Sequence, residues 1–251
     1  MTALALSIII FALVLAGISL GALLRRTLPR QHLGKDSQDV VRLGVGLIAT
    51  ISALVLGLLI AAAKSSFDTQ STQIKQITAD IILLDNLLDK YGPEGRPIRE
   101  HIRGAIGPFV DQLWREKAAA TGGPFAPNVA AENIYLAIQK LAPQDDLQRS
   151  LQARAAQVAT DLAQTRLLLF VESGNLIPTP FLAILIFWVV IIFASFSLFS
   201  PLNATVFICL AVFALSASCA IYLILELGQP FTGLLAISSE PLRHVLGPVG
   251  P

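Results

Sequence analysis

Four long apolar stretches divide the chain, and they cover residues 3–24, 43–63, 180–200 and 203–225. A helix rises about 1.5 Å per residue, so each stretch is long enough to cross the roughly 30 Å hydrocarbon core of a bilayer. Only Pro201 and Leu202 separate the last two stretches. The first has no basic segment before it and is followed by arginines, so we expect a retained span rather than a signal peptide. The pattern predicts four transmembrane helices in two hairpins.

The polar region between the hairpins, residues 64–179, has a different pattern. It begins with apolar residues at alternating spacings of three and four, as in the seam of a coiled coil: Ile74, Ile77, Ile81, Leu84, Leu88 and Tyr91. No proline or glycine separates this seam from the second span. We therefore expect one helix to leave the membrane at Lys64, continue in water and end at Gly92 and Pro93.

A second apolar stripe, spaced more like an ordinary helix, precedes the third span: Leu147, Leu151, Ala155, Val158, Leu162 and Leu169. Shorter helices are expected near residues 98–119 and 128–141, and no long segment alternates as a β-strand does. The sequence thus predicts an all-α, polytopic membrane protein with an inserted helical soluble domain. Its expected parts are hairpin 1–63, helical extramembrane domain 64–179, hairpin 180–227 and a tail along the membrane surface, 228–251.

The composition supports a membrane protein and excludes several functions. Charged residues make up 14% of the 251, against about 25% in soluble domains. The net charge is +1 without a long basic run, so nucleic acid is not an expected partner. His32, His101 and His244 lie in separate segments, and the G-x-G-x-x-A match in "GVGLIA" lies inside a span. We therefore expect no enzyme activity, metal or cofactor.

Basic residues in the short loops predict the orientation. The loop between the first two spans carries five: Arg25, Arg26, Arg30, Lys35 and Arg42. The amino terminus and the loop at Pro201 carry none. The positive-inside rule places the basic loop in the cytoplasm, so both termini and the helical domain would lie outside. In a bacterial inner membrane, the expected location, the helical domain would be periplasmic.

Small residues followed by a lysine form a strip along the second span: Gly46, Thr50, Ala53, Gly57 and Lys64. At about 100° per residue, all five lie within about 40° of one meridian of the helix. One interpretation is a pore-lining face, where Thr50 and Ser52 offer polar contacts and Lys64 attracts anions to the mouth. The other is close helix packing, the commoner role of such strips, with Lys64 reaching to the membrane surface.

Charged residues also gather near one predicted membrane boundary: Lys64, Asp68, Glu172, Glu226 and Arg243. Glu226 ends the fourth span, where a carboxylate is costly unless it is paired or hydrated. An interface ion pair with Lys64 or Arg243 is the commoner arrangement. Alternatively, Glu226, Glu172 and Asp68 could frame a cation site, where neighbouring acids raise each other's pKa values.

Two distant segments resemble a known family. The first is "KDSQDVVRLGVGLIATISALVLGLLIAAAKSSFDTQ", and the second combines "PTPF", Trp188, "SPLN" and "LILELGQPFTGLLAISSEPLR". They are similar to bacterial integral membrane proteins described as bestrophin-like, whose function is unassigned. The resemblance implies four spans. One departure is Gly228, where related sequences tend to have an acidic residue, so any cation site here loses a ligand.

The bestrophin label implies an oligomeric anion channel by fold-level analogy, and it implies a cytoplasmic region between spans two and three. That orientation is opposite to the one that the charge count predicts. The first hypothesis is a homo-oligomeric anion channel whose partners are the lipid bilayer, further copies of the chain and a small ion. The alternative is a membrane-anchored interaction or sensing protein whose helical domain binds a partner or an envelope component.

Overall fold

The computed structural model describes residues 3–29, 34–115, 129–172, 179–200 and 203–244. Every regular element in these ranges is a helix, as the sequence predicts. The chain divides into two compact units. The membrane unit combines Met1–Ser66 with Asn175–Gly228, and the helical unit combines Phe67–Gly174 with Gln229–Pro251.

Helices long and apolar enough to cross a membrane number four in the described chain, which confirms the predicted fold class. They are α1 (Ala3–Thr27), α2 (Lys35–Tyr91), α6 (Thr179–Phe199) and α7 (Ala204–Leu227). α2 is one helix of 57 residues, so the helix expected to continue beyond Lys64 does so without a break.

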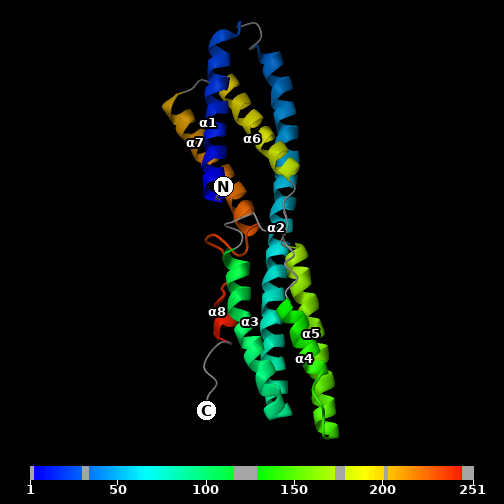
Figure 1. Cartoon of the computed structure of the whole chain (residues 1–251). Coiled ribbons are helices and arrows are strands. Elements are labelled where there is room, and N and C mark those ends of the chain that lie inside the picture. Colours follow the sequence, from blue (N-terminus) through cyan, green and yellow to red (C-terminus); the bar gives the residue numbers. More distant parts are fainter. Residues whose placement is uncertain (1–2, 30–33, 116–128, 173–178, 201–202, 245–251) are drawn as a thin grey trace. The chain divides into compact units, whose positions relative to one another are not determined.

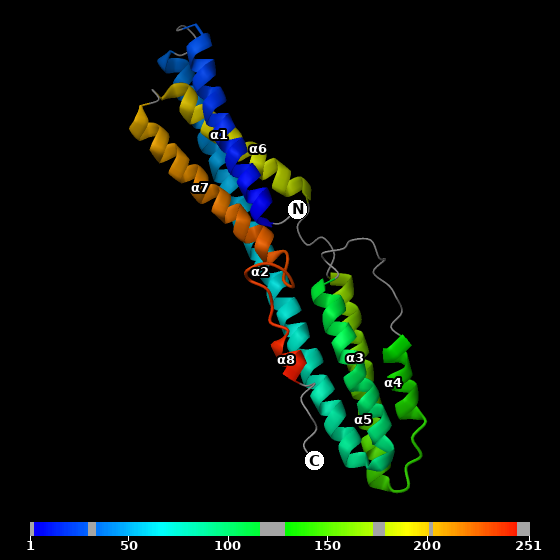
Figure 2. The same cartoon turned by 60° about the vertical axis from the view of Figure 1, so that its left-hand side comes forward.

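In the membrane unit, α1 packs against both α6 and α7 (Figures 1 and 2). Ile10 near the start of α1 shares an apolar cluster with Ile221 and Ile224 of α7. Ile18, two turns later, shares a cluster with Leu210. The two helices are therefore antiparallel, so the carboxyl end of α1 and the amino end of α7 lie at the same end of this unit.

Two glycines let α1 and α6 approach closely and run parallel. A Cβ atom added at Gly17 would lie 2.9 Å from Cγ1 of Val190, and one at Gly21 would lie 2.2 Å from the carbonyl oxygen of Ala194. In the same contact, the Ser197 hydroxyl of α6 donates a hydrogen bond of 2.7 Å to the Ile18 carbonyl of α1. "GISLG" is thus a small-xxx-small packing motif, which the sequence interpretation did not identify in this helix.

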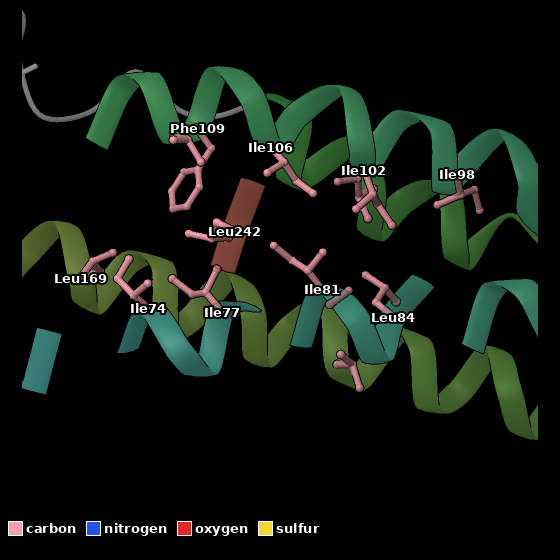
Figure 3. Close-up of a cluster of buried hydrophobic side chains, with 14 of the residues drawn as sticks. Ile74, Ile77, Ile81, Leu84, Ile98, Ile102, Ile106, Phe109, Leu169 and Leu242 are labelled. Atoms are coloured by element: carbon pink, nitrogen blue, oxygen red, sulfur yellow. The ribbon is translucent and has the colours of Figure 1, made fainter. Parts of the chain in front are cut away.

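The helical unit is built from the outer part of α2 with α3 (Arg96–Arg115), α4 (Val129–Gln139), α5 (Asp146–Glu172) and α8 (Glu240–His244). All six residues of the predicted seam are buried, none with more than 5% of its surface exposed. Figure 3 shows Ile77 and Ile81 of α2 facing Ile102 and Ile106 of α3 in this core.

Two residues of the second predicted stripe are not in the core, and Leu151 is half-buried outside it. Leu147 is 65% exposed in the first turn of α5. Its neighbour Gln148 is turned inward instead, and its side-chain amide donates a 3.1 Å hydrogen bond to the Tyr91 carbonyl at the end of α2. Further along α5, Ala155, Val158 and Leu169 are buried as expected.

The turn between α2 and α3 needs glycine at two positions. Gly92 has φ 117°, a left-handed conformation that side chains disfavour. A Cβ atom at Gly95 would lie 2.3 Å from the Leu88 carbonyl oxygen. The predicted end of the helix at Gly92 is therefore observed, and its cause is the backbone reversal at this glycine.

The segment after α7 belongs to the helical unit. Leu242 of α8 is fully buried, and Figure 3 shows it among core residues that include Phe109 and Ile77. Phe231 is also buried, and the centre of its ring lies 5.2 Å from the centre of the Trp114 ring in an edge-to-face arrangement. These contacts fix the predicted surface tail to α3 at Phe231 and Leu242.

Polar contacts hold the same tail. The Trp114 indole N–H donates a 2.9 Å hydrogen bond to the Ile237 carbonyl. Arg243 lies 3.7 Å from the Asp111 carboxylate of α3. Leu234, between these contacts, is 83% exposed, so contact of this part of the tail with lipid stays a prediction.

Candidate functional site on the second helix

The predicted strip of α2 lies on the outside of the chain. Gly46, Thr50, Ala53, Gly57 and Lys64 are all exposed. A Cβ atom added at Gly46 or Gly57 would meet nothing within 4 Å. The strip therefore serves no helix packing within this chain, where Gly17 and Gly21 of α1 have that role instead. The exposed strip is still available to pack against another copy of the chain.

The apolar part of α2 has three distinct faces. Its packing face holds the buried residues Val45, Ser52, Leu59 and Ala63, which lie about 100–140° around the helix from the strip. On the other side of the strip is an exposed leucine face: Leu43, Leu47, Leu54 and Leu58. Only 17% of the most apolar part of α2 is buried, against 22–28% for the other three helices. α2 thus offers most of its surface to lipid or to another chain.

The polar groups of this helix differ in their positions. The Thr50 hydroxyl donates a 2.9 Å hydrogen bond to the Gly46 carbonyl of its own helix, so its oxygen lone pairs stay on the strip. Ser52 is only 6% exposed and lies on the packing face, so the expectation that it borders the strip is wrong. The sequence suggested it because it is close to Thr50 along the chain, but two residues span about 200° of a helix.

Among the predicted charged residues whose side chains the structure describes, Glu226 is the most enclosed. It is 3% exposed and accepts a hydrogen bond from Tyr222, one turn earlier in α7. Lys64 belongs to the same membrane unit and is exposed. An ion pair between Lys64 and Glu226 stays a prediction.

The other residues of that predicted cluster belong to the helical unit. Arg243 lies beside Asp111 of α3, 3.7 Å away. Asp68 is exposed on α2, and the side chain of Glu172 is outside what the structure describes. In the described chain no three His, Cys, Asp or Glu side chains gather to hold a metal ion. The cation site therefore gains no support beyond the sequence pattern.

A cavity of about 490 Å³ in the membrane unit was not predicted from the sequence. It lies between α2, α6 and α7, and its lining includes Gln38, Arg42, Phe196, Phe199 and Leu210. Its volume falls within the range of about 300–1,000 Å³ that is typical of small-molecule sites. The walls come from segments that are remote in the sequence, and Arg42 was counted only as a topology signal. No local sequence motif could therefore have indicated the cavity.

The helical unit contains two acids whose pKa values shift in opposite directions. The Asp85 carboxylate accepts two 3.0 Å hydrogen bonds from Arg99 and one of 3.1 Å from Arg103. The hydrogen bonds from Arg99 are the main cause that holds the pKa of Asp85 below its ordinary value. Burial raises the pKa of Asp80, although the Gln76 amide donates a 2.9 Å hydrogen bond to it.

A small apolar pocket of about 70 Å³ also lies in the helical unit, lined by Ile81, Ile106 and Arg166 among others. The Arg166 guanidinium lies 4.8 Å from the centre of the Phe109 ring, a cation–π distance. Burial lowers the pKa of Arg166.

Comparison with known families decides the class of the protein. The profile of the bestrophin-like domain matches residues 11–242, which include all of α2, α6 and α7 and the helical region between the hairpins. This chain belongs to the bestrophin-like family. The match confirms the resemblance carried by the two signature segments. No curated protein and no solved structure matches the chain. Membership in the bestrophin-like family, together with the four apolar helices, establishes a membrane protein.

Proposed function

We propose that this bestrophin-like protein forms a homo-oligomeric channel that conducts anions along the strip of α2. The observation that carries the proposal is the position of the strip. Its small residues are exposed, and a Cβ atom added at Gly46 or Gly57 would meet nothing within 4 Å. The strip therefore has no packing role within the chain. Several copies with these strips turned inward would surround a path wide enough for an ion.

The chemistry of the strip suits anions. Small side chains leave room along the helix, and the Thr50 oxygen, whose hydrogen is donated to the Gly46 carbonyl, can accept a hydrogen bond from water in the path. Lys64 is exposed about 10 Å beyond Gly57 along the helix axis, on the same meridian, so its ammonium group would concentrate anions at one mouth. The exposed leucine face beside the strip would contact lipid or the neighbouring copy.

The proposal is tested by chloride flux from liposomes that contain the purified protein. Gly57→Phe should block flux, because its ring would occupy the path. Gly44→Phe is the matched control, since Gly44 is equally open but lies about 160° around the helix from Gly46. Lys64→Glu should lower chloride flux relative to potassium flux about tenfold. Absence of flux in several salts, or equal block by both phenylalanines, would refute a path along the strip.

For the location, we propose a bacterial inner membrane with the helical unit in the periplasm, following the five basic residues of the first loop. Alkaline phosphatase fused after Gly123 should be active, and a fusion after Leu33 should be inactive. The reverse result would give the orientation that the bestrophin analogy implies.

A second candidate function rests on the helical unit. This unit has its own apolar core, and residues 64–179 carry twelve basic and thirteen acidic residues, a mixed surface with no excess of one sign. A sensing or interaction protein would keep its function when unrelated spans replace its own. Loss of function in such a chimera, with ion flux present in the native protein, would exclude this candidate.

A further inference from the structure

We propose that the cavity between α2, α6 and α7 binds an anionic phospholipid of the surrounding bilayer, with the headgroup phosphate at Arg42. This inference rests on the four-span fold alone and does not depend on ion conduction. It concerns the face of α2 that borders α6 and α7, which meets the proposed path at Gly46, a residue that also lines the cavity.

The cavity is polar at one end and apolar along its length. On α2, Gln38 and Arg42 line it near the amino end of the helix, and Val45 and Ala49 line it deeper in the span. Arg42 and Ala49 are about 10 Å apart along the helix axis.

The facing helices add mostly apolar walls, including Phe199 and Val206 near the mouth. Ser200 lines the cavity at the carboxyl end of α6, and Phe196 lies one turn deeper. Leu210 of α7 adds a further apolar wall, and Ser195 is the polar exception at depth. A polar mouth above an apolar slot matches a phospholipid, with its headgroup at the water interface and its acyl chain in the membrane.

The charge at the mouth favours an anionic ligand. Arg42 is exposed at the end of the unit that also carries Arg25 and Arg26. Among the described residues no carboxylate pairs with Arg42, so its guanidinium is available for the bidentate phosphate contact that arginine favours. Basic pockets between transmembrane helices are recurrent sites for phospholipid headgroups.

The apolar walls decide between a lipid and free phosphate. A free phosphate would use only the mouth and leave the slot along Val45, Ala49 and Phe196 unfilled. An acyl chain from the bilayer fills that slot without exposing apolar surface, and lipid is present at high concentration. We therefore assign the site to a lipid, with free phosphate and a second copy of the chain as the alternatives to test.

The experiment counts the lipids bound to the full chain by native mass spectrometry. The protein is reconstituted in an equal mixture of phosphatidylcholine and phosphatidylglycerol and then extracted into detergent. The unmodified protein should retain phosphatidylglycerol. Arg42→Ala should weaken its retention about tenfold, because a charge-assisted hydrogen bond to phosphate is lost. Ala49→Phe should weaken retention as well, since its ring fills the slot while Arg42 remains.

Three controls make the result decisive. Arg26→Ala removes an exposed charge at the same end of the unit but outside the cavity lining, and it should leave retention unchanged. Thermal unfolding in lipid-free detergent identifies a variant that has lost its fold, and Arg42→Lys then supplies a milder second variant. Inorganic phosphate should not displace the bound lipid or raise the melting temperature as the lipid does.

Several results would overturn the inference. Equal loss in Arg26→Ala and Arg42→Ala would indicate general charge attraction, and unchanged retention in both cavity variants would place the lipid elsewhere. A changed subunit number in Ala49→Phe with the same lipid content would assign the cavity to a neighbouring chain. An effect of phosphate equal to that of the lipid would assign it to a free anion. Because chloride flux is measured separately, a failed channel proposal would not be confused with any of these results.

Discussion

Glycines in this protein serve two different purposes. Gly17 and Gly21 of α1 are places where the α6 backbone or side chains occupy the space that a Cβ would need. Gly44, Gly46 and Gly57 of α2 have nothing within that space. The first pair is explained by contacts inside the chain, whereas the second set makes no close contact within it.

We predict that Gly21→Ala destabilises the membrane unit by about 1–3 kcal/mol, because the added methyl group meets the Ala194 carbonyl oxygen at 2.2 Å. Gly44→Ala, an identical change in open space, should leave stability unchanged or raise it by up to about 1 kcal/mol. Thermal unfolding of both variants in the same detergent measures the difference. Equal stability of the two would contradict the close contact of α1 with α6.

Asp85 predicts a pH dependence for the helical unit. Its pKa is lowered from the ordinary 3.8 by Arg99 and Arg103, so the charged form is favoured in the folded state. The resulting stabilisation is present above about pH 4 and is lost as the pH falls through the lower folded pKa. Asp80 acts in the opposite direction, because its raised pKa favours the neutral form in the folded state.

Asp85→Asn should therefore cost about 2 kcal/mol at pH 7, with the lost charge-assisted hydrogen bonds as the cause. The stability difference from the unmodified protein should shrink as the pH falls below 4. Hydrogen exchange of the full chain in detergent, followed in α2 and α3, measures both. Asp80→Asn is the matched variant, and it should stabilise the unit at pH 7. A pH-independent penalty in Asp85→Asn would contradict the assigned ion pairs.

At the scale of elements, the surroundings of α2 differ between its two halves. In its apolar part a narrow face is buried and the rest is exposed, as suits a helix in contact with lipid or another chain. Beyond Lys64, the seam from Ile74 to Tyr91 is fully enclosed by α3, α5 and the tail. The two halves differ because the part beyond Lys64 is expected to lie in water, where its apolar seam must be covered.

The tail is the other element with a defined role, and we predict that Leu242→Ala releases it. Leu242 is fully buried, so its truncation should cost about 2–5 kcal/mol and increase proteolysis of residues 229–244. Leu234→Ala is the control, since Leu234 is 83% exposed and its truncation should cost less than about 0.5 kcal/mol. Limited proteolysis and thermal unfolding measure both variants. Equal protease sensitivity in the two would show that α8 does not hold the tail.

The sequence predicted what depends on local periodicity and length. The four spans and the seam of α2 are signals within one helix, and each was found. The glycine spacing of "GISLG" in α1 is visible in the sequence, but so is the similar spacing of small residues in the strip of α2. Only the position of the neighbouring helix shows that Gly17 and Gly21 are packed and that the strip is open.

Contacts between distant segments could not be predicted. Trp114 and Ile237 are joined by a hydrogen bond across 123 residues of sequence, and no local pattern links them. The cavity has the same origin, because its lining comes from α2, α6 and α7. The burial of Ser52 depends likewise on where the other helices lie, although its angle from Thr50 follows from helix geometry alone.

At the scale of the whole molecule, the chain is a bestrophin-like membrane protein with one membrane unit and one helical unit. Its function is proposed from a surface that the single chain leaves open. Small residues and Lys64 on one meridian of α2 are explained together if copies of the chain assemble around a wet path. A monomer surrounded by lipid would explain the exposed leucines and a lysine that reaches to the membrane surface, but not the aligned glycines.

Thiol accessibility of the assembled protein in liposomes tests this claim most directly. Cys209 and Cys219, which are both exposed on α7, are first replaced by alanine. A charged, water-soluble methanethiosulfonate should then react rapidly with Gly57→Cys, because a wet path permits the thiolate, and slowly with Leu58→Cys on the leucine face. Faster reaction of Leu58→Cys, or no reaction at either position, would show that the strip of α2 does not face water.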